Sequence, residues 1–150
     1  MIRSIDAAFL NRVVNHNSVF PHVSLGASKP LDLSACVADS RNYFLANEFG
    51  GFLLLRQHDY VYQVHTQFLP EGRGKTALKA GRWAAHYMFT QTDCLRIDTT
   101  VAYDNRHADW FTKALNFSKW DDVVVNGVPS HYYVLTLKQW ARSLACQQAQ

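Results

Sequence analysis

A strand-like run that passes through a proline and two glycines into an alanine-rich segment constrains the fold of this chain most strongly. Residues 60–68 alternate in polarity with the two-residue period of a half-buried β-strand. Pro70, Gly72 and Gly74 follow, and an alanine-rich helix is predicted over residues 75–90. Glycine at such a turn lets the backbone approach a ligand closely, and the free N–H groups of the helix's first turn point to the same place. The segment therefore predicts a strand–turn–helix unit that can receive an anion.

The side chains around this turn favour the same interpretation. Arg73 and Lys75 bring positive charge to it, so a phosphate-bearing ligand is the first hypothesis for the segment. The complete P-loop pattern and a Gly-x-Gly-x-x-Gly run, the two common phosphate fingerprints, are both missing. A tight loop without any ligand is the alternative interpretation, since Gly-x-Gly turns also serve that purpose.

Length and composition indicate one globular unit. A chain of 150 residues suits one domain with its own core, and a hydrophobic content of 48% excludes a disordered protein. No linker and no internal repeat divides the sequence. We therefore expect a single domain over residues 1–150, with N-terminal helices and an irregular segment over 1–42, the core over 43–137 and a C-terminal tail over 138–150.

Charge and cysteine usage exclude several classes of partner. Lys and Arg total 15 against 12 for Asp and Glu, and this net charge of +3 is too small and too dispersed to predict nucleic-acid binding. No apolar stretch approaches the ~20 residues that span a bilayer, so no membrane partner is expected. Cys36, Cys94 and Cys146 are odd in number and far apart, which predicts neither a disulfide framework nor a zinc site. We expect reduced cysteines, no bound metal and a cytoplasmic protein.

Periodicity and turn residues predict the remaining elements. Helices are expected over residues 5–15, 31–38, 75–90, 105–115 and 138–144, with Asp6 as a cap for the first. Strands are expected over residues 43–48, 52–57, 60–68, 95–101, 117–125 and 131–137. The expected turns are residues 49–51 and 58–59 and the hairpin turn Asn126-Gly127, and residues 15–30 are interpreted as a loop with little regular structure.

This order of elements predicts an α/β fold, or α+β by some schemes, built on a mixed sheet. The three strands between residues 43 and 68 are joined by very short turns, which makes them an antiparallel meander. The helix over residues 75–90 connects the third strand to the fourth, so these two strands are expected to be parallel. The glycine turn then lies at the carboxyl end of a strand where neighbouring strands can separate, a favoured position for phosphate ligands.

The element order and the turn together resemble the GNAT family of acyl-CoA-dependent N-acyltransferases, over about residues 43–137. The family's turn has the form Gln/Arg-x-x-Gly-x-Gly/Ala, and the matching run here is Glu71-Gly72-Arg73-Gly74-Lys75-Thr76. Gly74 matches the first required glycine, whereas Glu71 and Thr76 depart from the pattern. The resemblance implies a GNAT-like mixed sheet with helices on both faces.

The same resemblance implies where acetyl-CoA would bind. Its pyrophosphate would lie on the turn formed by Gly72, Arg73, Gly74, Lys75 and Thr76, while backbone N–H groups near Phe68 and Leu69 would align the pantetheine arm. The carboxylate of Glu71 would be a like-charge neighbour of that pyrophosphate unless Arg73 or Lys75 screens it.

A second run, from Asn105 to Phe117, resembles the family's Asn-x-x-Ala-x-x-Leu-Tyr-x-x-x-Gly-Phe motif. Asn105, Ala108 and Phe117 agree with it, which implies a place for Asn105 at the cofactor site. Asn105 is equally expected to cap its helix, because asparagine at a helix start satisfies free N–H groups. Thr112 stands where many members carry the tyrosine that protonates the leaving thiolate, and Asn116 replaces a glycine whose left-handed conformation asparagine tolerates.

Acyl transfer to an amine requires a base for the amine's proton and an acid for the departing sulfur. His65 is the first candidate base, since its ordinary pKa near 6.5 suits proton removal at neutral pH. A solvated or hydrogen-bonded histidine on the polar face of a sheet is the alternative for this residue. Glu48 and Asp98 are further candidates for the base, and Tyr103 is a candidate proton donor whose alternative role is packing.

Two classes of function follow. In the first, the protein transfers an acetyl group from acetyl-CoA to an amine acceptor by direct attack. In the second, the fold is kept and the reaction is lost, as the departures at Glu71, Thr76 and Thr112 suggest. The stretch from Val64 to Gly74 also resembles small GNAT-like proteins of tailed phages. That resemblance implies a structural or head-assembly protein with other phage particle proteins as partners, located in the virion.

Overall fold

Short connections dictate the first part of the sheet. The computed structural model describes residues 1–24 and 26–148, and in it β2 (Tyr43–Asn47) pairs with β3 (Gly50–His58) in antiparallel register, from Tyr43↔Leu54 to Asn47↔Gly50. A two-residue strand, β1 (Ile2–Arg3), which the sequence pattern does not predict, pairs antiparallel with β2. The next strand along the chain is β4 (Val61–Phe68).

The predicted turns on either side of β3 are each wrong by one or two residues. Gly50 and Gly51 belong to β3, and the turn consists of Glu48 and Phe49. Glycine is needed inside the strand because a Cβ atom at Gly51 would lie 2.1 Å from the carbonyl oxygen of Leu45. At the far end β3 continues to His58, and the turn to β4 contains Tyr60, whose φ is 67°.

The predicted parallel crossover is confirmed. A 3₁₀ turn, η1 (Pro70–Gly72), and α4 (Lys75–Gln91) connect β4 to β5 (Arg96–Ala102), and β4 and β5 pair in parallel from Val61↔Arg96 to Gln63↔Asp98. The burial of β4 differs from the predicted alternation, because Val61 and Tyr62 at one end and Gln67 and Phe68 at the other are all buried. Adjacent residues point to opposite faces of a strand, so β4 is covered on both faces at its ends.

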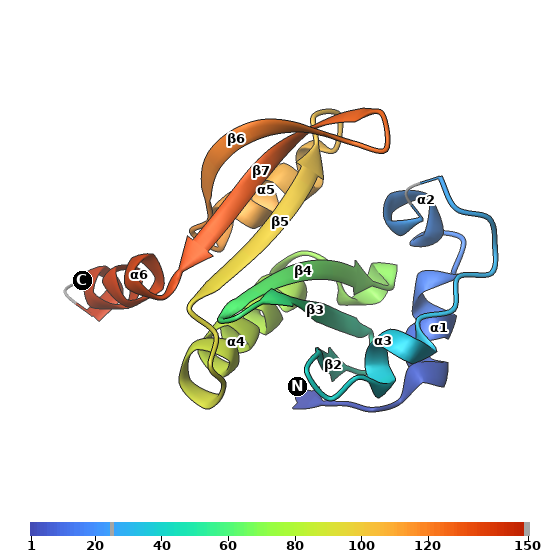
Figure 1. The fold of residues 1–150 in the computed structure, drawn as a ribbon, viewed down its shortest axis with the longest axis horizontal. Coiled ribbons are helices and arrows are strands. Elements are labelled where there is room, and N and C mark those ends of the chain that lie inside the picture. The colour runs from blue at the N-terminus through green and yellow to red at the C-terminus, as the bar shows by residue number, and fades with distance from the viewer. Residues whose placement is uncertain (25, 149–150) are drawn as a thin grey trace. The chain divides into compact units, whose positions relative to one another are not determined.

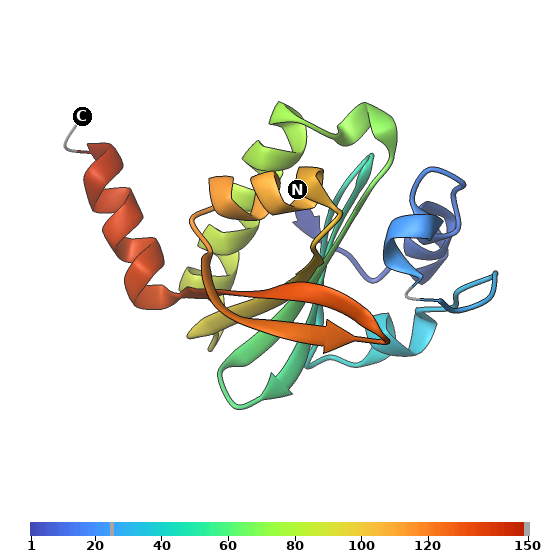
Figure 2. The same cartoon turned by 90° about the horizontal axis from the view of Figure 1, so that it is seen from above.

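A hairpin completes the sheet, as the Asn-Gly pair predicts. β6 (Ser118–Val125) and β7 (Val128–Thr136) pair antiparallel around Asn126 and Gly127, which both have positive φ. β7 also pairs antiparallel with β5, and the strand order of the seven-stranded mixed sheet is β1-β2-β3-β4-β5-β7-β6. α5 (Arg106–Ala114) lies against one face of the β5–β7–β6 part (Figures 1 and 2), and α6 (Leu137–Gln148), longer than predicted, follows β7.

The N-terminal helices pack on one face of the β2–β3 pair. α1 (Ala7–Val14) begins at Asp6, whose carboxylate accepts a hydrogen bond from the N–H of Phe9 at 2.9 Å, as its predicted capping role requires. α2 (Phe20–Val23) is a short helix within the segment that the sequence predicts as a loop, and α3 is Ser34–Ala38. Leu10 and Val14 of α1 pack with buried residues of both strands, and partly buried residues of α3 complete this cluster.

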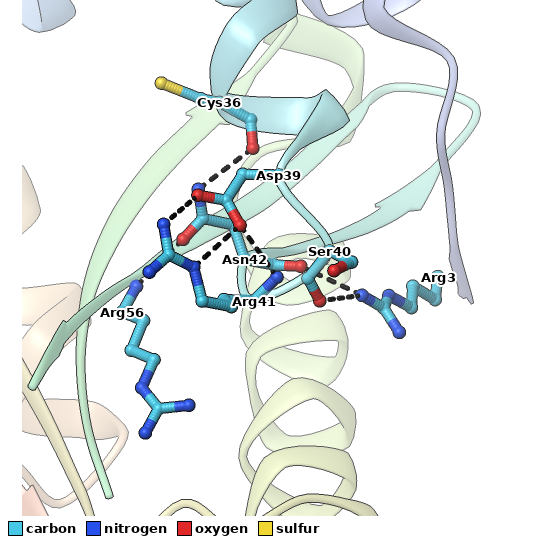
Figure 3. Close-up of polar contacts among 7 residues, drawn as sticks. All are labelled: Arg3, Cys36, Asp39, Ser40, Arg41, Asn42 and Arg56. Atoms are coloured by element: carbon cyan, nitrogen blue, oxygen red, sulfur yellow. Dashed lines mark hydrogen bonds and ion pairs between the residues drawn. The ribbon is translucent and has the colours of Figure 1, made fainter. Parts of the chain in front are cut away.

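Asn42 fixes the connection between α3 and β2 (Figure 3). Its amide nitrogen donates to the carbonyl of Cys36 at 2.9 Å, and its amide oxygen accepts from the N–H of Arg56 at 3.0 Å. The guanidinium of Arg3 donates to the carbonyls of Ser40 and Asn42, both at 3.0 Å. These contacts explain why β1 forms, since Arg3 lies in that strand.

The chain packs as two compact units. The first comprises Met1–Arg56 and Val64–Ala84, and therefore holds the predicted anion turn and His65. The second comprises Gln57–Gln63 and the residues from Ala85 onward, and holds Tyr103 and Asn105. The single domain expected over residues 1–150 stays a prediction.

Candidate functional site

The turn that follows β4 is packed closely against the turn between β2 and β3. The N–H of Leu69 donates to the carbonyl of Phe49 at 2.8 Å, and the N–H of Gly72 donates back to the carbonyl of Leu69 at 2.9 Å. Gly72 is buried, and a Cβ atom there would lie 2.3 Å from the Cβ atom of Phe49. Only glycine therefore fits at this position without a shift of the loop.

Gly74 opens α4 in a conformation that suits glycine. Its φ is 72°, and a Cβ atom added to it would meet nothing within 4 Å. The first helical hydrogen bond runs from the N–H of Leu78 to the carbonyl of Gly74 at 3.0 Å. The N–H groups of Lys75, Thr76 and Ala77 precede that bond, so they have no acceptor within the helix. Open space, free donors and the positive end of a 17-residue helix coincide here.

Three residues at the start of α4 also match part of a phosphate-binding sequence pattern. Gly74-Lys75-Thr76 matches the last three residues of the P-loop pattern, although Leu69 stands where that pattern begins with glycine. The side chains of Lys75 and Thr76 are both exposed. A cation and a hydroxyl group are thus available beside the free amides.

Arg73 lies differently from the sequence-based expectation of a cation directed at the ligand. Its Nε donates to the carbonyl of Phe68 at 3.1 Å, and a terminal nitrogen donates to the carbonyl of Ser18 at 2.7 Å. The residue therefore links β4 and the segment between α1 and α2 to the turn. No pattern in the sequence connects Ser18 with Arg73, because 55 residues separate them.

The two residues predicted to align the pantetheine arm are both engaged in this structure. Phe68 is buried, its ring packs edge-on against Phe52 with centroids 5.2 Å apart, and its carbonyl accepts from Arg73. The N–H of Leu69 is used by the carbonyl of Phe49. A ligand that takes this N–H has to displace that bond.

The candidate bases lie in contrasting surroundings. His65 is half-buried on β4, and burial lowers its pKa below the usual 6.5, so the imidazole is neutral at pH 7. Glu48 is exposed in the turn between β2 and β3. Asp98, the third candidate, is buried on β5, where it pairs with Arg96 at 2.9 Å and accepts a hydrogen bond from the hydroxyl of Tyr132. The carboxylate of Asp98 is therefore engaged by two partners within β5 and β7.

In the second unit, the hydroxyl of Tyr103 donates to the carboxylate of Asp122 on β6. This hydrogen bond is the main reason why the pKa of Tyr103 is raised above 10, so the phenol holds its proton at neutral pH. The ring lies 4.4 Å from that of His131, centroid to centroid, and the Nδ1 atom of His131 is enclosed 3.9 Å from the same carboxylate. The sequence analysis did not identify Asp122 and His131 as site residues. The predicted hairpin could have indicated that they lie opposite each other, as they do in β6 and β7.

Several residues of the second motif, Asn105 to Phe117, have structural roles in α5 and at its ends. The side chain of Asn105 accepts from the N–H of Ala108 at 3.1 Å, which confirms the expected cap of α5. Asn116 adopts the predicted left-handed conformation, with φ of 70°. Thr112 is 7% exposed, and its hydroxyl donates to the carbonyl of Ala108 at 2.8 Å. This hydroxyl is therefore engaged by the backbone of its own helix.

Within residues 1–24 and 26–148, every helix is too short or too polar to cross a membrane. In the same part of the chain, no group of three or more His, Cys, Asp and Glu side chains is arranged to hold a metal ion. Cys36, Cys94 and Cys146 are free, as their spacing predicts.

Comparison with known proteins adds to this geometry. No protein-family model matches the sequence, and no curated protein sequence matches it. Among solved structures, spermidine N-acetyltransferase from Vibrio cholerae, in complex with CoA and spermine, superposes with a TM-score of 0.73 over 91% of this chain and 92% of its own, at 16% identity. A GNAT-family acetyltransferase from Bacillus anthracis has a TM-score of 0.71 over 92% and 93% of the two chains, at 14% identity.

A third match was solved with a different bound molecule beside coenzyme A. Aminoglycoside acetyltransferase AAC(6')-Ib, in complex with coenzyme A and kanamycin, has a TM-score of 0.72 over 95% of this chain and 96% of its own, at 16% identity. These superpositions extend over nearly the whole of each chain. This chain has the GNAT fold.

The GNAT fold explains the mixed sheet and the parallel β4–β5 crossover, and it confirms the fold that the sequence resemblance implies. The more specific resemblance to phage proteins finds no support in these matches. At 14–16% identity these matches establish the fold alone.

Proposed function

We propose that this GNAT-fold protein is an acyl-CoA-dependent N-acyltransferase that transfers an acetyl group to an amine by direct attack. The observation that carries the proposal is the start of α4, where Gly74 leaves open space beside N–H groups that have no acceptor in the helix. Dipole, amides and the exposed cation of Lys75 all favour a bound anion at this point.

The residues present fit a pyrophosphate group. Gly72 lets the turn pack on Phe49, Gly74 leaves open space beside the backbone, Lys75 supplies charge and Thr76 supplies a hydroxyl donor. The departure at Glu71 does not prevent binding, because this side chain is exposed and its carboxylate can remain in water.

The solved structures support the class of substrates. The V. cholerae enzyme was solved with CoA and spermine, and AAC(6')-Ib with coenzyme A and kanamycin. Both of these acceptors carry amino groups. For the present chain we infer an amine acceptor, whose identity the low sequence identity does not specify.

Acetyl-CoA supplies the thioester whose C–S bond breaks as the new C–N bond forms. We assign the removal of the amine's proton to His65, since burial keeps this imidazole neutral and able to accept it at pH 7. Glu48 is the second candidate for that role. Tyr103, which holds its proton at neutral pH, is assigned the return of a proton to the sulfur, and the products are the N-acetylated amine and the free thiol.

Three residues are assigned to cofactor binding through their backbone or position. Phe68 and Leu69 lie directly before the anion turn and would guide the pantetheine arm once the Leu69 N–H leaves the carbonyl of Phe49. Asn105 is assigned to the same cofactor in addition to its role as a helix cap.

The test is thermal unfolding with and without acetyl-CoA. Because the ligand binds the folded state, a hundredfold excess over Kd is expected to add ~2.7 kcal/mol to the free energy of unfolding. Gly74→Glu should remove this effect, since it places a carboxylate in the open space. Gly127→Glu is the matched control, because Gly127 also has a positive φ, 79°, with nothing within 4 Å of an added Cβ atom. No shift in Tm at millimolar acetyl-CoA contradicts the proposal.

One observation favours a second candidate, a GNAT-fold protein that has lost catalysis and has a structural role. Thr112, which replaces the family's usual proton donor, is buried and bonded to the backbone. The two candidates are separated by thiol release from acetyl-CoA in the presence of a panel of polyamines and aminoglycosides. Stabilisation by CoA without thiol release favours the second candidate.

A further inference from the structure

Arg73 connects three segments of the first unit. Its guanidinium donates to the carbonyl of Phe68 at the end of β4 and to the carbonyl of Ser18 in the segment between α1 and α2. Its own backbone lies between Gly72 and Gly74, in the turn assigned to the anion. Figure 2 shows this turn, in light green, on the side of the first unit where α1 and α2 lie.

The segment that Arg73 holds, residues 15–20, is short and partly ordered by its own contacts. The N–H groups of Val19 and Phe20 both donate to the carbonyl of His16 at 2.9 Å, and the His16 ring bonds the hydroxyl of Ser18 at 2.6 Å. Val19 is 3% exposed, so its position depends on packing as well. A hydrogen bond from a charged donor to Ser18 stabilises this arrangement from outside.

The guanidinium keeps capacity for a ligand while it makes both bonds. It has five N–H donors in a rigid plane, and the two described bonds use one on Nε and one on a terminal nitrogen. The side chain is exposed. An anion on the neighbouring amides can thus engage the remaining donors without breaking the bond to Ser18.

We infer that Arg73 is a positioning residue that couples occupation of the anion turn to the order of residues 15–20. This inference rests on the proposed function for the identity of the ligand, but the link itself exists in the free protein. Because coupling between two places is reciprocal, an anion at the turn makes the segment more rigid, and an ordered segment strengthens anion binding. The same residue then sets the path of the chain between α1 and α2 during catalysis.

Hydrogen exchange at the N–H groups of Val19 and Phe20 measures this coupling. Arg73→Ala is expected to speed exchange at both positions roughly tenfold in the free protein, as the loss of a charge-assisted hydrogen bond implies. The Arg73→Lys variant should also show fast exchange at these two N–H groups, because one ammonium group cannot reproduce the planar fork of the guanidinium. Lys75→Ala is the matched control: it removes a cation from the same turn and should leave these two exchange rates unchanged.

The same exchange rates are then measured with a ligand present. Inorganic pyrophosphate and CoA are each expected to slow exchange at Val19 and Phe20 in the wild type and to have no such effect in Arg73→Ala. Wild-type exchange rates in Arg73→Ala, or in Arg73→Lys, would overturn the inference, as would a wild type in which neither ligand changes these rates. A wild type that responds to pyrophosphate and not to CoA supports the coupling and contradicts the proposed function, so the two failures are distinguishable.

Discussion

Gly72 lies directly against the side chain of Phe49, so close that a Cβ atom at residue 72 would be 2.3 Å from that of Phe49. The N–H of Leu69 also donates to the carbonyl of Phe49 at 2.8 Å. The turn between β2 and β3 thus forms the support on which the anion turn rests. Changes at this contact should alter the turn without touching the start of α4.

Gly72→Ala is expected to destabilise the protein by roughly 1–3 kcal/mol, because the added methyl group overlaps Phe49 and forces the loop to shift. Urea unfolding measures this change. Phe49→Gly removes the Cβ atom that the new methyl group would meet, so the double mutant should be more stable than the sum of the two single changes predicts. Additive free energies would show that the contact does not restrict the loop.

His65→Ala is expected to lower kcat about 10²–10⁴-fold if the imidazole is the base. Burial depresses its pKa, so the acid limb of the wild-type rate profile should have its midpoint below 6.5. The active form is the neutral one, which is fully present above that midpoint and lost as the pH falls through it. His22→Ala, a change at an exposed histidine, is the control. Full turnover in His65→Ala would transfer the role to another residue, with Glu48→Gln as the next variant.

Tyr103→Phe and Thr112→Val should have opposite effects. Loss of the Tyr103 hydroxyl removes the assigned proton donor and is expected to reduce kcat at least tenfold with little change in Tm, since the side chain is 46% exposed. Thr112→Val removes a buried hydroxyl bonded to Ala108, so it should cost about 1 kcal/mol of stability and leave kcat nearly unchanged. The reverse pattern would assign the proton transfer to Thr112.

Asp109 should make stability depend on pH below neutrality. The hydroxyl of Tyr133, followed by Lys113 at 2.9 Å, lowers the pKa of Asp109 below its usual 3.8. A carboxyl group whose pKa is lowered by folding stabilises the folded state at pH values above its pKa in the unfolded chain. This contribution is lost as the pH falls through the pKa of the folded state. Asp109→Asn should therefore be less stable than the wild type at pH 7, by roughly 1 kcal/mol, and the difference should shrink near pH 3. Urea unfolding at both pH values checks this, and a constant difference would contradict it.

Most elements could be predicted from local sequence because local physics forms them. Asp6 and Asn105 cap their helices as expected, and Asn126-Gly127 forms the predicted turn. The misplaced turn at residues 49–51 shows the limit of such reasoning. Gly50 and Gly51 look like turn residues in the sequence, but close approach of neighbouring backbone requires them inside β3.

For the candidate site, too, local sequence predicts one part of the structure and not another. The strand–turn–helix unit with Gly74 at the start of α4 follows from neighbouring residues, whose conformational preferences operate over a few positions. The hydrogen-bond partners of the site's side chains do not follow from neighbouring residues. Arg73 with Ser18, Tyr103 with Asp122 and Asp98 with Tyr132 are pairings between residues far apart in the sequence, and the folded structure reveals them.

The sequence by itself determined the parallel crossover, the glycine turn before α4 and the order of the strands and helices other than β1 and α2. These features arise from periodicity, turn residues and glycine conformation, which are properties of adjacent residues. Only the tertiary structure decided that Arg73 links the anion turn to β4 and to the segment between α1 and α2, that the Leu69 N–H is taken by Phe49 and that Thr112 is buried. In the two hydrogen-bonded contacts the donor takes an acceptor from a distant part of the chain, brought within about 3 Å by folding, so neighbouring residues do not reveal the choice.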